Sequence, residues 1–152
     1  MAFTKEEILA LVPQQPPFRF IDEIIDLDDE GIVATYTFKE NESFYEGHFP
    51  GNPITPGVIL LETMAQTGVV AYGLYLASKS MSLEEIQKTL TVFTDAEVEF
   101  TGMVRPGDKV IIKAQKLFFR RLKLKAQAEI RLENGEVVCS GTIAGIGVKS
   151  NG

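Results

Sequence analysis

Residues 55–77 read TPGVILLETMAQTGVVAYGLYLA, and this stretch decides the fold. Threonine can cap the free amides at a helix start, and proline suits the first helical position. We therefore expect Thr55 and Pro56 to open a helix that runs from Val58 to Ala77. Its side chains are apolar nearly all round, which is typical of a helix that is buried on every side.

The same helix is long enough to cross a bilayer, so a membrane span is the alternative. Two polar residues, Glu62 and Gln66, lie one turn apart near its start. Such side chains are costly in lipid. The pattern therefore favours a core helix of a globular protein, with no membrane span.

The chain before this helix has the pattern of a short helix and a hairpin. Thr4 and Glu7 form a capping-box pattern, and the helix that they open must stop near Pro13. Residues 18–28 and 31–39 are rich in Ile, Val, Phe, Tyr and Thr, with the turn sequence Asp-Asp-Glu-Gly at their junction. We expect two paired strands there.

The chain after the long helix reads as a second short helix and four strands. Ser82 and Glu85 suggest a capping box for a helix over residues 83–88. Apolar and polar residues alternate without exception from Leu122 to Glu133, which is the period of a half-buried strand. The other strands are expected over residues 89–100, 109–119 and 136–148, with turns at Arg105-Pro106-Gly107-Asp108 and Asn134-Gly135.

This order of elements defines the fold class. One long apolar helix lies between a two-strand segment and a four-strand segment, and no linker or repeat interrupts the 152 residues. We expect a single α+β domain over residues 1–152, in which an antiparallel sheet from both ends of the chain covers the helix.

Composition excludes several classes of protein. The net charge of −6 argues against nucleic-acid binding, which depends on clustered Lys and Arg. The single cysteine, Cys139, cannot form an internal disulfide, which fits a reducing cytoplasm. The N-terminal apolar run is too short for a secretory signal. No metal-ligand set, nucleotide loop or Gly-x-Ser-x-Gly elbow is present, so we expect no metal and no cofactor.

One motif carries the functional hypothesis. Residues 47–66, GHFPGNPITPGVILLETMAQ, contain the only histidine, His48, fourteen residues before Glu62. This string resembles the active-site signature of the beta-hydroxyacyl-acyl-carrier-protein dehydratases. The resemblance extends from Ile8 to the Arg105–Asp108 turn and implies a hotdog fold, in which a curved antiparallel sheet wraps one long helix.

The chemistry of that reaction explains the residue types. Removing water from a 3-hydroxyacyl thioester needs a base, an acid and donors for the enolate-like oxygen. An imidazole ordinarily changes charge near neutral pH, which suits His48 to the role of base. A carboxyl buried in an apolar helix has a raised pKa and can donate a proton, which suits Glu62. The free amides at Gly57 and Val58 face the thioester oxygen.

The resemblance implies further roles and partners. The Gly57 amide binds the thioester carbonyl, the Ile54 carbonyl orients the imidazole, and Gln66 supports Glu62 from the next turn. The substrate is a 3-hydroxyacyl chain on the phosphopantetheine of an acyl carrier protein. The family also implies a homodimer in which His48 of one subunit works with Glu62 of the other, and many members form hexamers as trimers of dimers.

Two departures from the family pattern concern the acyl pocket. Relatives commonly have a second histidine where this chain has Gln14, and often methionine where it has Thr55. Glu62 favours plain dehydration, because isomerising relatives usually have aspartate there. Two other functions remain open: a hotdog thioesterase, which generally lacks the histidine-proline-glycine string, and a non-catalytic acyl-binding partner subunit.

The one basic cluster lies at Phe118–Lys125, in FFRRLKLK. A solvated outer strand face that discourages aggregation is the favoured interpretation. Carrier docking by Arg120, Arg121 and Lys123 is the alternative, since an acidic carrier would be attracted to it.

Overall fold

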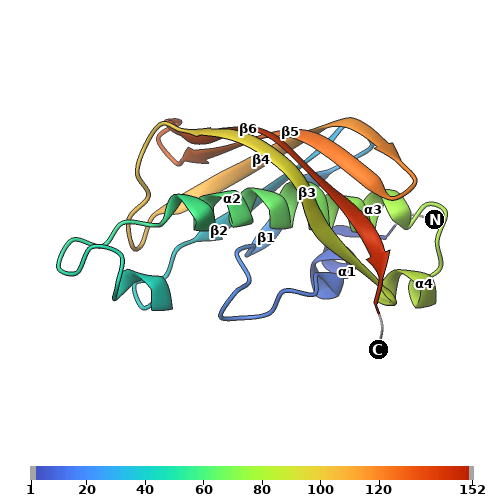
Figure 1. Ribbon diagram of the computed structural model, residues 1–152, viewed down its shortest axis with the longest axis horizontal. Coiled ribbons are helices and arrows are strands. Elements are labelled where there is room, and N and C mark those ends of the chain that lie inside the picture. The colour runs from blue at the N-terminus through green and yellow to red at the C-terminus, as the bar shows by residue number, and fades with distance from the viewer. Residues whose placement is uncertain (1–2, 151–152) are drawn as a thin grey trace.

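The computed structural model describes residues 3–150. Figure 1 shows a six-stranded sheet that arches over one long helix, with short helices at the margins. The helical segments are α1 (Lys5–Leu11), η1 (Ser43–Tyr45), α2 (Gly57–Ala65), η2 (Gln66–Ala71), α3 (Tyr72–Ala77) and α4 (Leu83–Gln87). The strands are β1 (Glu23–Leu27), β2 (Gly31–Thr37), β3 (Thr89–Phe100), β4 (Lys109–Arg120), β5 (Lys123–Leu132) and β6 (Val137–Lys149).

The element order predicted from the sequence is confirmed. The sheet order is β1-β2-β4-β5-β6-β3, and every pairing is antiparallel. Both capping boxes form, at Thr4 and at Ser82. On β5 the apolar positions from Leu124 to Ile130 are buried while the alternate positions are not. The alternation in the sequence therefore reports which face of the sheet covers the helix.

The predicted first strand is too long at its start. Residues 18–22 precede β1 and lie in the loop that follows α1. The Arg19 side chain holds this loop, because its guanidinium donates to the Val12 carbonyl at 2.6 Å and to the Gln14 carbonyl at 2.8 Å. A side chain that bonds its own upstream backbone favours a turn over an extended strand.

The central helix is continuous from Gly57 to Ala77, but its middle turn is a π-helix, which the sequence did not predict. All six residues of this π segment, η2, are buried. A Cβ added at Gly68 would lie 3.1 Å from the Ala114 side chain and 3.2 Å from that of Ile143. Glycine thus lets the helix approach the sheet closely at this point.

This helix is also the one described segment that is long and apolar enough to span a membrane. In the fold, 61% of its most apolar window is buried inside the protein. The arched sheet covers it, as Figure 1 shows. It is therefore the core helix of the domain.

The start of the helix corrects the predicted cap. Pro56 is the N-cap, and no side chain caps the helix. The Thr55 hydroxyl lies 2.6 Å from the Tyr45 hydroxyl instead, while the Thr55 amide donates to the Val104 carbonyl at 2.8 Å. Because Thr55 is held on both sides by neighbouring segments, it cannot turn toward the helix amides.

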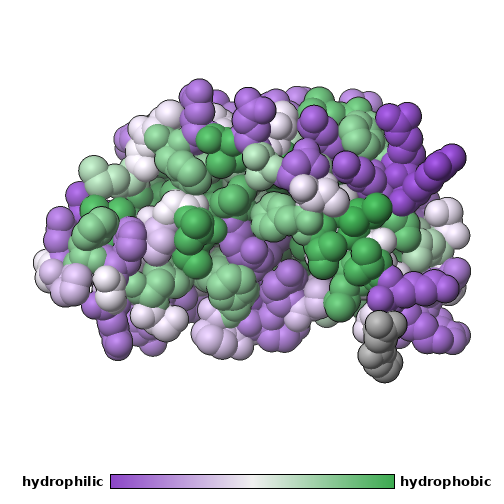
Figure 2. All heavy atoms as spheres, in the orientation of Figure 1, coloured by the Kyte–Doolittle hydropathy of each residue, from purple (hydrophilic) through white to green (hydrophobic). Residues whose placement is uncertain are grey.

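The two edges of the sheet differ. The β1 edge lies beside α1, while the β3 edge carries large apolar side chains that are exposed, namely Leu90, Val92, Phe93 and Phe100. Figure 2 shows apolar atoms gathered over the same face. An exposed strand edge with apolar side chains is a surface suited to pairing with another chain.

Candidate active site

The loop that carries His48 connects η1 to α2. It begins with a hydrogen bond from the His48 amide to the Phe44 carbonyl at 3.1 Å. It then turns at Phe49 and Gly51, which both have positive φ. The Asn52 side chain accepts a hydrogen bond from Arg105 at 3.3 Å, which ties the loop to the turn before β4.

The imidazole of His48 is oriented by the backbone. Its Nδ1 lies 2.8 Å from the Ile54 carbonyl oxygen, as the resemblance implies. A carbonyl only accepts hydrogen bonds, so Nδ1 carries the proton and donates. In the neutral ring, Nε2 then holds the free lone pair, which is the arrangement that a general base needs.

Buried polar contacts hold the two ends of this loop in place. Glu42 is buried, accepts from the Tyr36 hydroxyl, and also accepts from the Lys39 amide at 3.1 Å. Glu42 in turn begins η1, where its carbonyl accepts from the Tyr45 amide at 3.1 Å. The hydroxyl contact between Tyr45 and Thr55 then joins the two ends of the loop. No pattern in the sequence predicts this contact between Tyr45 and Thr55.

Glu62 lies on α2 with Gln66 one turn later. The Gln66 amide nitrogen donates to Glu62 Oε2 at 2.8 Å and to the Phe18 carbonyl at 2.9 Å. Its oxygen accepts from the Phe20 amide at 2.7 Å, so the fully buried amide has one fixed orientation. Burial raises the pKa of Glu62, and the hydrogen bond from Gln66 opposes that rise in part. The expected supporting contact is therefore present.

The amides of Gly57 and Val58 precede the first hydrogen-bonded turn of α2. The first bonds of the helix run from the Ile59 and Leu60 amides to the Pro56 carbonyl, at 2.9 and 3.2 Å. A Cβ at Gly57 would lie 3.3 Å from the Phe100 ring, so any larger residue there would need that ring to shift. With no side-chain cap, the helix start presents free donors to an anionic oxygen.

Within one chain the two halves of the site are not joined. Among residues 3–150, no hydrogen bond connects His48 to Glu62. Glu62 lines a cavity of about 50 Å³ with Gln14, two turns of the central helix and the β3 edge, and His48 is not among its lining residues. Figure 1 shows the His48 loop reaching beyond the first turn of α2, away from the body of the sheet.

The basic residues lie elsewhere. Arg120, Arg121 and Lys123 surround the β4–β5 turn, at the opposite end of the molecule from the His48 loop (Figure 1). Arg120 lies over the Phe118 ring, 5.0 Å from its centroid, and Lys123 lies 3.7 Å from Asp95. The turn itself is tight, since Arg121 has a positive φ. Carrier docking at this turn stays a prediction.

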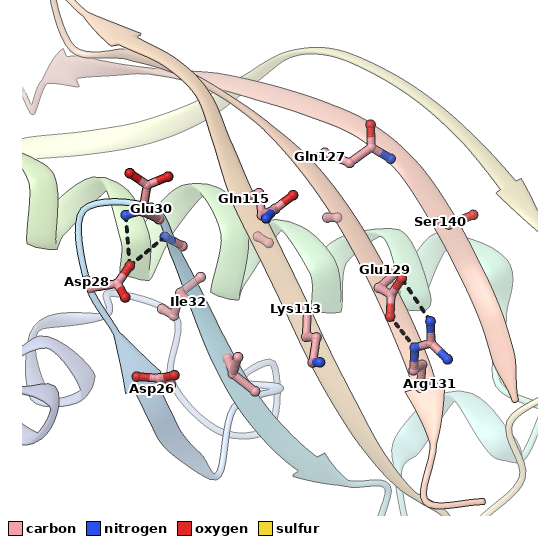
Figure 3. Close-up of a pocket in the computed structure, with 14 residues that line it drawn as sticks. Asp26, Asp28, Glu30, Ile32, Lys113, Gln115, Gln127, Glu129, Arg131 and Ser140 are labelled. Carbon is pink, nitrogen blue, oxygen red and sulfur yellow. Dashed lines mark hydrogen bonds and ion pairs between the residues drawn. The ribbon is translucent and has the colours of Figure 1, made fainter. Parts of the chain in front are cut away.

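A cavity larger than that of Glu62 lies away from the predicted site. It is an open groove of about 440 Å³ on the outer face of the sheet. Figure 3 shows that charged and amide side chains line it, including Asp26, Lys113 and Arg131. None of the predicted site residues lies there. Within residues 3–150, no group of His, Cys, Asp and Glu side chains is arranged to hold a metal ion.

Comparison with known sequences identifies the family. Residues 12–144 match the FabA-like domain. A 3-hydroxyacyl-acyl-carrier-protein dehydratase FabZ from Caldicellulosiruptor saccharolyticus is 36% identical over 138 residues, which cover 90% of this chain and 92% of that protein. A protein of the same name from Chloroflexus aggregans is 40% identical over 126 residues, or 81% of each chain.

Solved structures extend the likeness to the fold. The dehydratase heterocomplex ApeI:P from Xenorhabdus doucetiae gives a TM-score of 0.77 at 14% identity, over 93% of this chain and 91% of that one. A thioesterase from Haemophilus influenzae gives 0.67 at 19% identity, over 100% and 95%. At these identities the likeness concerns the hotdog fold alone. Together with the sequence relatives, it leads to one conclusion: the chain belongs to the FabA-like domain family, beside the FabZ dehydratases.

Proposed function

We propose that this protein is a (3R)-hydroxyacyl-acyl-carrier-protein dehydratase, which removes water from a 3-hydroxyacyl thioester to form the trans-2-enoyl thioester. The observation that carries the proposal is the state of the two candidate groups. His48 has its Nδ1 on a backbone carbonyl, which leaves Nε2 basic, and Glu62 has a carboxyl whose pKa is raised by burial. A free ring nitrogen that can accept a proton and a buried carboxyl that can donate one are what this elimination needs.

The reaction divides between these groups. Nε2 of His48 takes the proton from C2 of the acyl chain, and the electron pair moves into the thioester carbonyl. The amides of Gly57 and Val58 stabilise the oxygen that gains charge. The pair then returns to form the C2–C3 double bond while the C3–O bond breaks. Glu62 donates its proton to the departing hydroxyl, which leaves as water, and exchange with solvent resets both groups.

A homodimer is part of the proposal. Two observations support it: within one chain His48 does not line the cavity of Glu62, and the β3 edge beside that cavity exposes apolar side chains. A second copy that pairs along β3 would cover these side chains. It would also bring its His48 loop to this Glu62. Association of three such dimers into a hexamer is the further step that the family resemblance implies.

The substrate and setting complete the proposal. The acyl chain reaches the enzyme on the phosphopantetheine arm of an acyl carrier protein, and no cofactor takes part. Arg120, Arg121 and Lys123 are the candidate docking residues for the carrier. Residues 1–152 act as one domain, and the buried single cysteine suits a cytoplasmic enzyme of fatty-acid or polyketide-like synthesis.

The direct test is turnover of 3-hydroxyacyl carrier thioesters of several chain lengths. We expect enoyl absorbance to appear with no release of free thiol. Free thiol without enoyl product would indicate a thioesterase, and binding without any turnover would indicate a non-catalytic acyl-binding subunit. Either result would overturn the proposal.

The subunit arrangement has its own test. His48→Ala and Glu62→Gln proteins are each expected to be inactive, and they can be unfolded, mixed and refolded together. If the site is shared between subunits, half of the random dimers contain one intact site, so activity should return to about a quarter of the wild-type level. No recovery, with dimers verified in the mixture, would place both groups in one chain.

A further inference from the structure

Thr55 is a buried residue beside the candidate base that the proposed mechanism does not yet use. It is only 4% exposed, and it follows Ile54, whose carbonyl holds His48. The Ile54 carbonyl and the Thr55 amide belong to one peptide unit, which is planar and trans. Its C=O and N–H therefore point in opposite directions, and the direction of one fixes the direction of the other.

This peptide unit is held from both sides. On one side the Ile54 oxygen lies 2.8 Å from Nδ1 of His48. On the other side the Thr55 amide donates to the Val104 carbonyl at 2.8 Å. Val104 is fully buried and belongs to the hydrophobic core. The imidazole thus takes its orientation from a fixed point of the core, through one rigid peptide plane.

The Thr55 side chain holds the same unit at a third point. Its hydroxyl lies 2.6 Å from the Tyr45 hydroxyl, and both residues are buried. Tyr45 ends η1, where its amide donates to the Glu42 carbonyl at 3.1 Å. Because the Thr55 side chain and amide share one Cα, rotation of the peptide unit would strain the hydroxyl contact. A buried hydroxyl without a partner is unfavourable, so the contact opposes that rotation.

We propose, on the basis of the dehydratase function above, that Thr55 is a positioning residue for the base. Through its contact with Tyr45 it holds the Ile54 carbonyl where that oxygen accepts from Nδ1 of His48. The proton then stays on Nδ1, and the lone pair of Nε2 stays directed at C2 of the acyl chain. Thr55 acts through His48 alone, without contact to the substrate.

The only histidine of the chain gives this proposal a direct measurement. Isotope labelling of histidine ring nitrogens yields NMR signals from His48 alone. In a neutral imidazole the protonated and the free nitrogen have well separated signals, so the spectrum reports which nitrogen carries the proton. Spectra are recorded at alkaline pH, where an imidazole is ordinarily neutral. This measurement needs no substrate and no turnover.

Three substitutions address the contact, and a fourth is the control. Thr55→Val keeps the size and removes the hydroxyl, Thr55→Ser keeps the hydroxyl, and Tyr45→Phe breaks the same contact from the other side. The control is Ser78→Ala. Ser78 is 5% exposed, and its hydroxyl donates to the Tyr75 carbonyl at 2.6 Å. It follows α3, at the other end of the central helix from Thr55.

We expect Thr55→Val and Tyr45→Phe each to lower kcat for dehydration by roughly five-fold, the factor that corresponds to one lost hydrogen bond. KM should not change. In both variants the imidazole should pass from the Nδ1–H form to a mixture with the Nε2–H form. Thr55→Ser should recover the rate and the spectrum. The double variant should lose no more activity than either single variant, because both changes break one contact.

Two results would overturn the positioning role. One is a wild-type imidazole spectrum in Thr55→Val, whatever its activity. The other is an equal loss of kcat in Ser78→Ala, which would mean that general destabilisation lowers the rate. Failure of the proposed function is a different result. The wild-type protein would then form no enoyl product, while the change in the imidazole spectrum of Thr55→Val would still appear.

Discussion

The two halves of the candidate site are built in different ways. Glu62 and Gln66 project from a helix whose position is set by the core, and Gln66 is fully buried. His48 lies in a loop whose neighbouring residues are largely exposed, and backbone contacts position it. The acid thus depends on packing and the base depends on loop geometry. Substitutions should separate these two kinds of support.

The largest effect is expected at the two reacting groups. His48→Ala and Glu62→Gln should each lower kcat by roughly 10²- to 10⁴-fold, the usual contribution of general acid or base catalysis. A second measurement should separate them, namely exchange of the C2 hydrogens of a saturated acyl thioester for deuterium in heavy water. His48→Ala should lose this exchange, while Glu62→Gln should retain it. Circular dichroism should show an intact fold in both. Equal loss of exchange in the two variants would contradict the division of roles.

The next effect concerns the support of the acid. Gln66→Met removes the donor that opposes the rise in the pKa of Glu62, so that pKa should rise further. Because Glu62 must be protonated to act, activity falls as the pH rises through its pKa. The alkaline limb of the kcat profile should therefore shift to higher pH in this variant. A shift to lower pH would show that the limb belongs to another group.

The same substitution should weaken the fold. Gln66 bonds Phe18 and Phe20 as well as Glu62, so its replacement leaves buried backbone groups unpaired. A loss of roughly 1–3 kcal/mol in the free energy of unfolding is expected. Denaturant titration measures it, and Gln87→Met on the exposed end of α4 is the control.

Substitutions at the contact that supports the His48 loop should have a smaller effect on stability. Burial raises the pKa of Tyr45 to about 12, so its hydroxyl stays neutral and can bond Thr55. Tyr45→Phe and Thr55→Val should each cost roughly 1 kcal/mol of stability, as for a typical hydrogen bond. In the double variant the two losses should be less than additive. Strict additivity would mean that the contact contributes nothing.

The smallest effect is expected at the basic turn. Reversal of charge at Arg120, Arg121 and Lys123 should weaken turnover of carrier-bound substrate by a few-fold, with less effect at high salt. A short thioester analogue should be turned over as before. An equal effect on both substrates would indicate that these residues keep the strand end solvated and do not bind the carrier.

Sequence patterns predicted most of the fold, because a helix or strand that buries one face needs apolar residues at a regular spacing. The alternation over β5 and the bounds of β3 agree with the structure. The contact of His48 with Ile54 was expected only from the family resemblance. The π segment and the contact of Tyr45 with Thr55 were not foreseen, because both arise from tertiary packing between segments that no local pattern relates. The expected Thr55 cap was wrong for the same reason.

Because of the open β3 edge, the stability of the fold should depend on assembly. The apolar side chains of this edge are costly to leave in water, and its open backbone groups can pair with another strand. If a second chain normally covers them, the thermal midpoint should climb with protein concentration, since dilution removes that cover. Newly made chains would then be most prone to aggregate in the interval before they meet a partner.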